Sequence, residues 1–300
     1  MRVLLAGWFS FPGMGASAGD LMCRDLVREW LESAGMAVTV ATATPFTDGV
    51  NWESLDPASV DGVVFVCGPF GNGWPIPEFL ERFSGKRLVG INLSMLEDLE
   101  TWNPFDALFE RDSSRMERPD AVFLAPLRRA PVVGLVLVHP QKEYGERGLH
   151  ERANQALQAL AERRGAAIVP IDTRLDENRT GLTTPAQVDA LIGRMDLILT
   201  TRLHGMVMAL RNGVPPIAVD PIAGGAKILR QAKKIDWSHA YLVHTDLDLQ
   251  LDEAWDRLFS QEGRAHAAST AQAARIMLAQ LEPEFISAMD PQYDAAKGRG

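Results

Sequence analysis

The sequence predicts an α/β fold built from two Rossmann-like domains. Short apolar runs alternate with segments whose apolar residues recur at helical spacing, which is the pattern of parallel sheets covered by helices. The chain has 300 residues, 46% of them hydrophobic, which is ample for two cores. The segment Pro-Leu-Arg-Arg-Ala-Pro at 126–131 is the most linker-like part of the chain. We therefore expect domains over residues 1–128 and 129–300.

The first domain shows an alternation of short strands and amphipathic helices. We expect strands at 2–6, 37–41, 62–67, 87–92 and 121–124, and helices at 20–34 and 76–83. The small-residue loop 13–19 leads to Asp20, which suits a helix cap. No Gly-Lys-Ser/Thr follows this loop, and it is not a convincing dinucleotide fingerprint. A nucleoside triphosphate or nicotinamide role is therefore disfavoured.

The second domain repeats this alternation and contains the most informative segment. We expect strands at 132–138, 166–171, 196–200 and 214–220, and helices at 148–164, 203–212 and from Lys227 onward. Arg202 and His204 stand where a strand ends and a helix begins. Open α/β sheets bind ligands at such points, because unpaired N–H groups and the positive end of the helix face the crevice. This segment therefore predicts an anion site.

Two motifs here resemble the C-terminal signature of the polysaccharide pyruvyl transferase family. They are Thr-Arg-Leu-His-Gly at 201–205 and Gly-Val-Pro at 213–215, followed by an apolar strand and a helix that carries Lys227. Glu-Arg-Asp-Ser-Ser at 110–114 looks like the Arg-Asp-x-x-Ser element of that family, and Gly19-Asp20 looks like the end of its Gly-Asp loop. The resemblance implies a GT-B-type architecture, with the two domains facing a central cleft. The helical tail 263–289 would then pack back toward the first domain.

The sequence departs from the family pattern at three places. The first glycine loop lacks Asn-Thr-Gly-Asp, and a Gly-Gly-Gly segment is reduced to Gly-Pro-Phe-Gly at 68–71. His139 ends a strand where many members carry arginine. These departures leave open a changed acceptor or a changed reaction.

The resemblance implies transfer of the pyruvyl group of phosphoenolpyruvate to two hydroxyls of a saccharide or lipid-linked saccharide, without a metal or nucleotide cofactor. Arg202 suits a phosphate or carboxylate because its planar fork makes two charge-assisted bonds. N–H groups of the helix that begins at Leu203 add to that site. His204 suits proton transfer. Lys227 and His139 are the further candidate ligands of the donor.

Each candidate also has a structural alternative. For Arg111 and Asp112 the alternative is a structural ion pair across the domain junction, which we favour. For Asp20 the favoured alternative is a helix cap. Gly71, a candidate for the acceptor side, is equally suited to a tight turn. The cations that follow Arg202 reach as far as Lys234 and are equally typical of a solvated helix face. The remaining histidines lack metal-like spacing, so we expect no metal site.

Composition narrows the class of protein. A net charge of −9 argues against a nucleic-acid partner. Two cysteines give no disulfide framework, residues 1–8 are too short for a signal segment, and no apolar run approaches a membrane span. We expect a cytoplasmic enzyme; a peripheral encounter with the membrane stays open, as does the oligomeric state. The rival hypotheses are a GT-B glycosyltransferase that uses a nucleotide sugar and a non-catalytic sugar or anion sensor.

Overall fold

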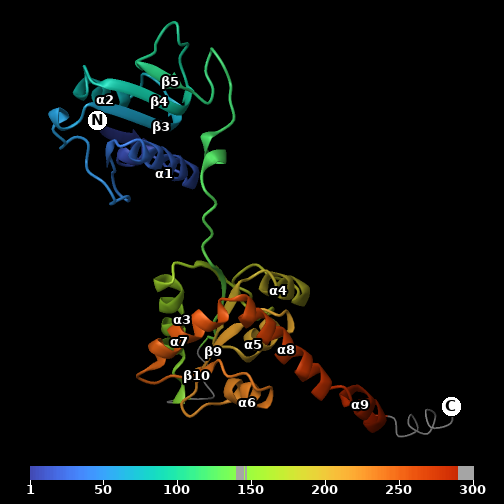
Figure 1. Cartoon of the computed structure of the whole chain (residues 1–300). Helices are drawn as coiled ribbons and strands as arrows, with labels where there is room; N and C mark the ends of the chain where they lie inside the picture. The colour runs from blue at the N-terminus through green and yellow to red at the C-terminus, as the bar shows by residue number, and fades with distance from the viewer. Residues whose placement is uncertain (140–144, 146, 290–300) are drawn as a thin grey trace. The chain divides into compact units, whose positions relative to one another are not determined.

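The computed structural model describes residues 1–139, 145 and 147–289, and it divides into two compact units (Figure 1). Unit 1 is Met1–Arg128, and unit 2 begins at Arg129. Each unit holds a five-stranded parallel sheet with helices packed on it, so the expected α/β class is confirmed. That the units face one cleft, and that the last helix packs on unit 1, stay predictions.

The sheet of unit 1 has the order β2-β1-β3-β4-β5. Its strands are β1 Arg2–Gly7, β2 Ala37–Val40, β3 Gly62–Phe70, β4 Arg87–Met95 and β5 Ala107–Phe109. Helices α1 Ala18–Ser33 and α2 Ile76–Arg82 accompany them, with short 3₁₀ turns at Trp8–Ser10, Pro57–Ser59 and Ala121–Leu124. The central strand β3 is buried from Gly62 to Cys67, as its unbroken apolar run predicts.

Two expectations for unit 1 were wrong in detail. Residues 121–124 form a 3₁₀ turn and not a strand, because the Asp120 carboxylate accepts the Val122 N–H at 2.8 Å and caps the turn. The short strand β5 was not expected at all; its three residues carry too little pattern to be distinguished from a loop.

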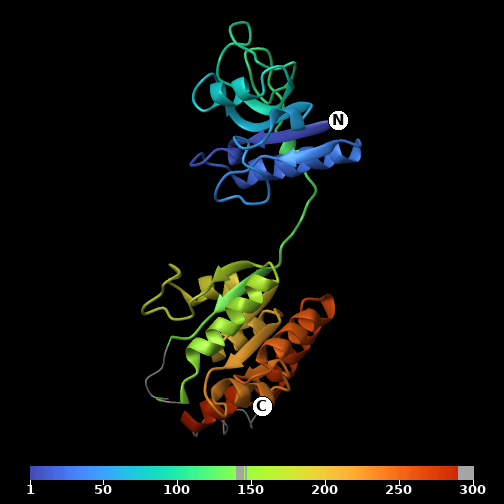
Figure 2. The ribbon, with the colours of Figure 1, turned by 90° about the vertical axis from the view of Figure 1, so that its left-hand side faces the viewer.

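The sheet of unit 2 has the order β10-β9-β8-β6-β7. Its strands are β6 Val132–Val136, β7 Ala167–Pro170, β8 Leu197–Thr200, β9 Pro216–Asp220 and β10 Ala240–Leu242. Its helices are α3 His150–Arg163, α4 Pro185–Ile192, α5 Leu203–Arg211, α6 Lys227–Lys234, α7 Leu247–Leu258, α8 Gln261–Met277 and α9 Leu281–Met289. Counted along the chain, both units have the strand order 2-1-3-4-5. In Figure 2, α3 lies across the strands of this second sheet.

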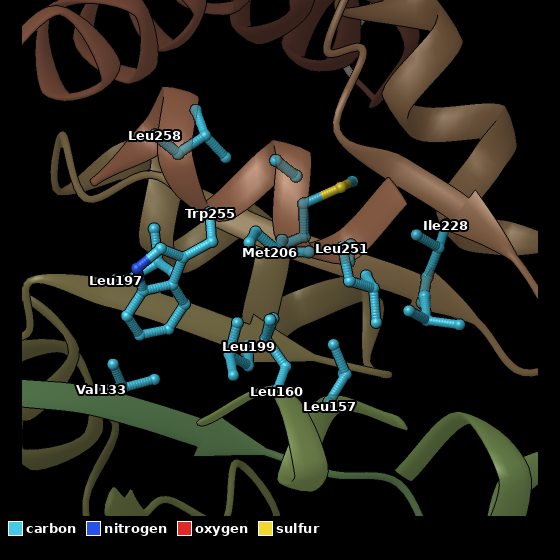
Figure 3. Packing of buried hydrophobic residues seen from close by; sticks show 14 of the residues in the cluster. Val133, Leu157, Leu160, Leu197, Leu199, Met206, Ile228, Leu251, Trp255 and Leu258 are labelled. Atoms are coloured by element: carbon cyan, nitrogen blue, oxygen red, sulfur yellow. The ribbon is translucent and has the colours of Figure 1, made fainter. Parts of the chain in front are cut away.

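The larger of two apolar clusters in unit 2 joins the sheet to α3 and α7 and includes residues of α5, α6 and α8. Figure 3 shows Leu197 and Leu199 of β8 facing Leu157 and Leu160 of α3, with Trp255 of α7 beside them. Ile198 belongs instead to a cluster with residues of α4. Successive strand residues point to opposite faces, so α3 and α4 cover opposite faces of the sheet. Burying each of these large side chains stabilises the unit by roughly 1.5–3 kcal/mol.

The helical tail is divided. We expected one helical stretch over 263–289, and the structure has α8 and α9, separated after Met277. Helix α8 contacts α5 and α7. Helices α4 and α7 and strand β10 were not among the elements that we expected. Within the described residues, none of the helices combines the length and apolarity that crossing a bilayer requires.

The burial of His239, just before β10, makes the stability of unit 2 dependent on pH. Burial lowers the pKa of His239 from 6.5 to about 4, and the nearby His266 and Arg257 add to this effect. The unfolded chain therefore binds a proton on this ring below about pH 6.5, whereas the folded chain resists it down to about pH 4. Above this pH window His239 is neutral in both states and does not reduce the free energy of unfolding. As the pH falls through the window, the free energy of unfolding decreases by up to about 3 kcal/mol.

We predict that His239→Gln reduces the stability lost between pH 7 and pH 4. Native-state hydrogen exchange of the peptide that spans β9 and β10 measures this. His244→Gln, a change of an exposed histidine in the same segment, is the control and should lose as much stability as the wild type. Equal losses in all three proteins would contradict the role given to His239.

Candidate active site

Chain topology places a crevice at the carboxyl ends of β6 and β8. The chain leaves β6 for its neighbour β7 on one side and later returns to β8 on the other. Helices on opposite faces diverge at such a switch point, and open α/β sheets bind ligands there. The residues that follow the two strands are 137–139 and 201–202, so the predicted site residues His139 and Arg202 flank this point.

Two threonines tie these strand ends together. The Thr200 hydroxyl donates to the Val136 carbonyl at 2.9 Å and accepts the N–H of Arg202 at 2.9 Å. The Thr201 hydroxyl accepts the Val138 N–H at 2.9 Å and donates to the side chain of Asn154 in α3 at 2.8 Å. The backbone before Arg202 is therefore fixed to β6 and to α3.

Gly205 lets α5 approach the end of β8. An added Cβ would lie 2.2 Å from Thr200 Oγ1 and 2.9 Å from Val136 Cγ1, both too close for real atoms. The glycine of the Thr-Arg-Leu-His-Gly motif is thus a packing requirement. It brings the start of α5 to the switch point.

The Arg202 side chain is mostly buried, and hydrogen bonds to residues that follow β6 and β7 fix its guanidinium. Its Nε donates to the Leu137 carbonyl at 3.0 Å, and Nη1 donates to the Thr173 hydroxyl at 3.3 Å. Nη2 lies 3.8 Å from Asp172 Oδ1. Burial lowers the pKa of Arg202, and Asp172 opposes that effect. An arginine stays protonated in proteins, so a fixed positive charge stands at this edge.

The start of α5 adds backbone donors to that charge. Arg202 is the N-cap residue, and among the described residues no side chain caps this helix end. The first intrahelical bond runs from the Met206 N–H to the Arg202 carbonyl. The N–H groups of residues 203–205 therefore remain available to an anion at the positive end of the helix dipole.

A pocket of about 170 Å³ opens beside these groups. It is lined by residues from the ends of four strands and the starts of two helices: Val138, Thr173, Thr201, Arg202, Leu203, His204, Asp220, Pro221, Ile222, Ala226, Lys227 and Ile228. The structure thus brings together four predicted donor residues, Arg202, Leu203, His204 and Lys227. Both His204 and Lys227 are exposed.

Asp220 occupies the start of the neighbouring helix α6. Its buried carboxylate accepts N–H groups from Ile222 at 3.2 Å, Ala226 at 2.7 Å and Leu229 at 3.2 Å. An acceptor from the protein itself therefore already stands at the start of α6. The side chain of Lys227, which lines the pocket, can meet an anion from this side.

His139 and Asp172 lie beside the pocket. His139 Nε2 is 3.8 Å from Asp172 Oδ2, and His139 itself is not a lining residue. Asp172 was not predicted, although it directly follows the apolar run 166–171. The strand-end argument that singled out Arg202 would have found it too.

The predicted residues of unit 1 have structural partners there. Asp20 is the third residue of α1, and Ser17 is the N-cap: each side chain accepts the other residue's N–H, at 2.7 and 3.3 Å. Arg111 pairs with Asp112 at 3.0 Å and Asp120 at 3.1 Å and also donates to Ser94, so its ion pair lies inside unit 1.

Gly71 follows β3 in unit 1. A Cβ there would meet Leu96 at 2.9 Å and Glu97 at 3.0 Å. The next N–H, that of Asn72, is accepted by Glu97 at 2.9 Å, so a tight backbone turn is one role that the structure gives this segment. Its placement on an acceptor side stays a prediction.

Not every expected cation is at the pocket. Arg230, Lys233 and Lys234 lie exposed along α6, and none of them lines it. Among the described residues there is also no group of three His, Cys, Asp or Glu side chains arranged to hold a metal ion.

We predict that Gly205→Ala disturbs both unit 2 and its anion site. Crowding against Thr200 and Val136 should lower the free energy of unfolding by about 1–3 kcal/mol and move the α5 N–H groups. Chemical denaturation measures the first effect, and titration with inorganic phosphate measures the second. Gly15→Ala, where an added Cβ meets open space, is the matched control. Unchanged phosphate binding in Gly205→Ala would contradict this account of the helix start.

Known proteins resemble this chain in two respects, in structure and in sequence. Structures that are similar include the UDP-GlcNAc 2-epimerase of Methanocaldococcus jannaschii with UDP-GlcNAc and UDP (11% identity, 92% of this chain and 99% of that one, TM-score 0.33). A second is the glycosyltransferase SnogD of Streptomyces nogalater (15% identity, 91% of this chain and 94% of that one, TM-score 0.30). A third is T4 phage BGT with UDP and Mn²⁺ (10% identity, 97% of this chain and 100% of that one, TM-score 0.29). Likenesses this distant carry no conclusion about the chain.

The sequence itself gives the more specific result. No curated protein matches it. The polysaccharide pyruvyl transferase family matches residues 118–221, a range that contains His139, Asp172, Arg202 and His204 and ends before Lys227. Over these residues the resemblance that the motifs indicated is confirmed: this part of the chain matches the polysaccharide pyruvyl transferase family, a family of transferases.

Proposed function

We propose that the protein transfers the pyruvyl group of phosphoenolpyruvate to two hydroxyls of a saccharide, forming a ketal and releasing phosphate. The observation that carries the proposal is the anchored guanidinium of Arg202 beside the uncapped start of α5. The proposed donor carries a phosphate and a carboxylate, and this pair of groups suits one of them through several charge-assisted bonds.

The size of the pocket supports a small donor. A volume of about 170 Å³ is below the roughly 300–1,000 Å³ typical of sites for drug-sized ligands. Phosphoenolpyruvate fits this scale better than a nucleotide sugar does. Lys227, which also lines the pocket, would meet the second anionic group of the donor.

His204 supports the chemical step. It lies on the first turn of α5, lines the pocket and is exposed. Ketal formation needs a proton at the vinyl carbon and a base for the attacking hydroxyl, and an imidazole performs both tasks near neutral pH. Phosphoenolpyruvate is a metabolite of the cytoplasm, so the proposed donor places the reaction there. The acceptor class that fits the family is a cell-envelope or extracellular polysaccharide precursor, free or lipid-linked.

We predict that calorimetric titration with phosphoenolpyruvate gives saturable binding that Arg202→Ala weakens at least tenfold, about 1.4 kcal/mol. Arg202→Lys should recover only part of the affinity, because lysine lacks the fork that Leu137 and Thr173 hold. Arg211→Ala, which removes an exposed arginine from the last turn of α5, is the control and should bind normally. Saturable binding of a uridine or guanosine diphosphate sugar, with none of phosphoenolpyruvate, would favour the glycosyltransferase alternative.

We also predict that His204→Gln binds phosphoenolpyruvate within about threefold of the wild type but releases phosphate 10²–10⁴ times more slowly. The assay supplies phosphoenolpyruvate with a panel of aryl hexosides and aryl N-acetylhexosaminides and follows inorganic phosphate. Phosphate release that depends on an acceptor would rule out a non-catalytic sensor. Full activity in His204→Gln would remove this residue from the chemistry.

A further inference from the structure

Asp172 is a buried carboxylate that lacks the hydrogen bonds such a group normally has. Its side chain is 7% exposed. Oδ1 accepts the Arg174 N–H at 3.0 Å, whereas Oδ2 has no hydrogen-bond partner in the described part of the chain. Two basic side chains stand nearby: Arg202 Nη2 is 3.8 Å from Oδ1, and His139 Nε2 is 3.8 Å from Oδ2. A buried carboxylate with so few donors is costly unless it serves these neighbours.

The backbone of the loop after β7 holds this carboxylate in place. The Asn178 side chain donates to the Asp172 carbonyl at 2.8 Å, and the Asp172 N–H donates to the Thr180 hydroxyl at 3.3 Å. The next residue, Thr173, lines the pocket and binds Arg202. Asp172 is therefore a fixed group directly behind the pocket wall.

We propose that His139, held by Asp172, is a second acid–base group of the reaction and that it protonates the departing phosphate. This inference rests on the proposed function. The two oxygens of Asp172 face different partners, Oδ1 the guanidinium that would bind the phosphate and Oδ2 the imidazole of His139, so one carboxylate links the two groups. The 3.8 Å separation is longer than a hydrogen bond, as is common in unliganded sites whose contacts tighten in the complex.

The reaction gives such a group a task. In the first half, one hydroxyl oxygen bonds to C2 of phosphoenolpyruvate, its proton passes to a base, and an acid delivers a proton to C3. In the second half, the C2–O bond to phosphate breaks, phosphate leaves with the electron pair and takes a proton, and the second hydroxyl bonds to C2 and loses its proton. Two protons leave the hydroxyls and two are delivered, so no oxidant or reductant is needed.

The two histidines would divide this work. His204, on the first turn of α5, serves the carbon and the first hydroxyl. His139 delivers its proton from Nδ1 to the phosphate and recovers one from the second hydroxyl, while Nε2–H faces Asp172. A carboxylate behind an imidazole fixes the tautomer in this way in other acid–base pairs. His139 is then a catalytic residue, and Asp172 is a positioning residue that acts through it.

A double-mutant cycle on the full chain tests the pair. His139→Gln and Asp172→Asn should each slow acceptor-dependent phosphate release at least 30-fold, and the double variant should be no slower than His139→Gln alone. The affinity for phosphoenolpyruvate should stay within about threefold in all three. Asp176→Asn, which changes an exposed carboxylate of the same loop, is the matched control and should be fully active.

A second measurement needs neither turnover nor a folded Asp172 variant. Long-range ¹H–¹⁵N NMR of the wild type labelled with ¹⁵N-histidine, with the His139 signals assigned through His139→Gln, should show neutral His139 mainly as the Nε2–H tautomer. A mixed or Nδ1–H population would overturn the pairing.

The kinetic outcomes separate this inference from the function on which it rests. Additive losses, or a loss of donor affinity without a loss of rate, would mean that Asp172 only anchors Arg202, and the inference falls. Full activity in His139→Gln would overturn it as well. A wild type that neither binds nor consumes phosphoenolpyruvate would overturn the proposed function itself, and this inference with it.

Discussion

The candidate site depends on the hydrogen bonds that join the ends of β6 and β8. Thr200 and Thr201 are adjacent in sequence, and their hydroxyls form hydrogen bonds with different elements. Thr200 binds the end of β6 and stands against Gly205 of α5, whereas Thr201 binds Asn154 of α3. One strand end therefore positions both α3 and α5. Arg202 follows directly, so its position is set by the fold and not by a flexible loop.

The starts of α5 and α6 line the same pocket, but they differ in the side chain that stands beside their free N–H groups. Asp220 ends β9, and its carboxylate accepts the N–H groups of Ala226 and Leu229 at the start of α6, so the protein itself supplies an acceptor there. Arg202 directly precedes α5, and an arginine cannot accept N–H groups. Under the proposed function, this contrast favours α5 over α6 as the helix whose start binds the donor.

Sequence patterns predicted those features that depend on neighbours along the chain. The apolar runs gave the parallel strands, and the strand-to-helix junction at Arg202 gave the site, because both follow from local spacing. The ion pair of Asp172 with Arg202 and the hydrogen bond of Thr201 with Asn154 join segments that are far apart in sequence, and no local pattern predicts such contacts. In unit 1, the sequence suggested the pair of Arg111 with Asp112, but the contacts of Arg111 with Asp120 and Ser94 are revealed only by the packed fold. The short elements β5 and Ala121–Leu124 were not predicted correctly for another reason: three or four residues are too few to show a hydrophobic period.

The carboxylate of Asp172 is not at odds with an anionic substrate. Without Asp172, the unliganded Arg202 would be a largely buried charge with the neutral partners Leu137 and Thr173, and burial already lowers its pKa. Asp172 offsets that charge from behind, and the distance of 3.8 Å leaves the donor N–H groups of the guanidinium uncommitted to it. An arriving phosphate can take those N–H groups without breaking an ion pair of ideal geometry. A shorter contact would bind Arg202 more firmly and weaken the site, so the loose pair keeps the cation both stable and available.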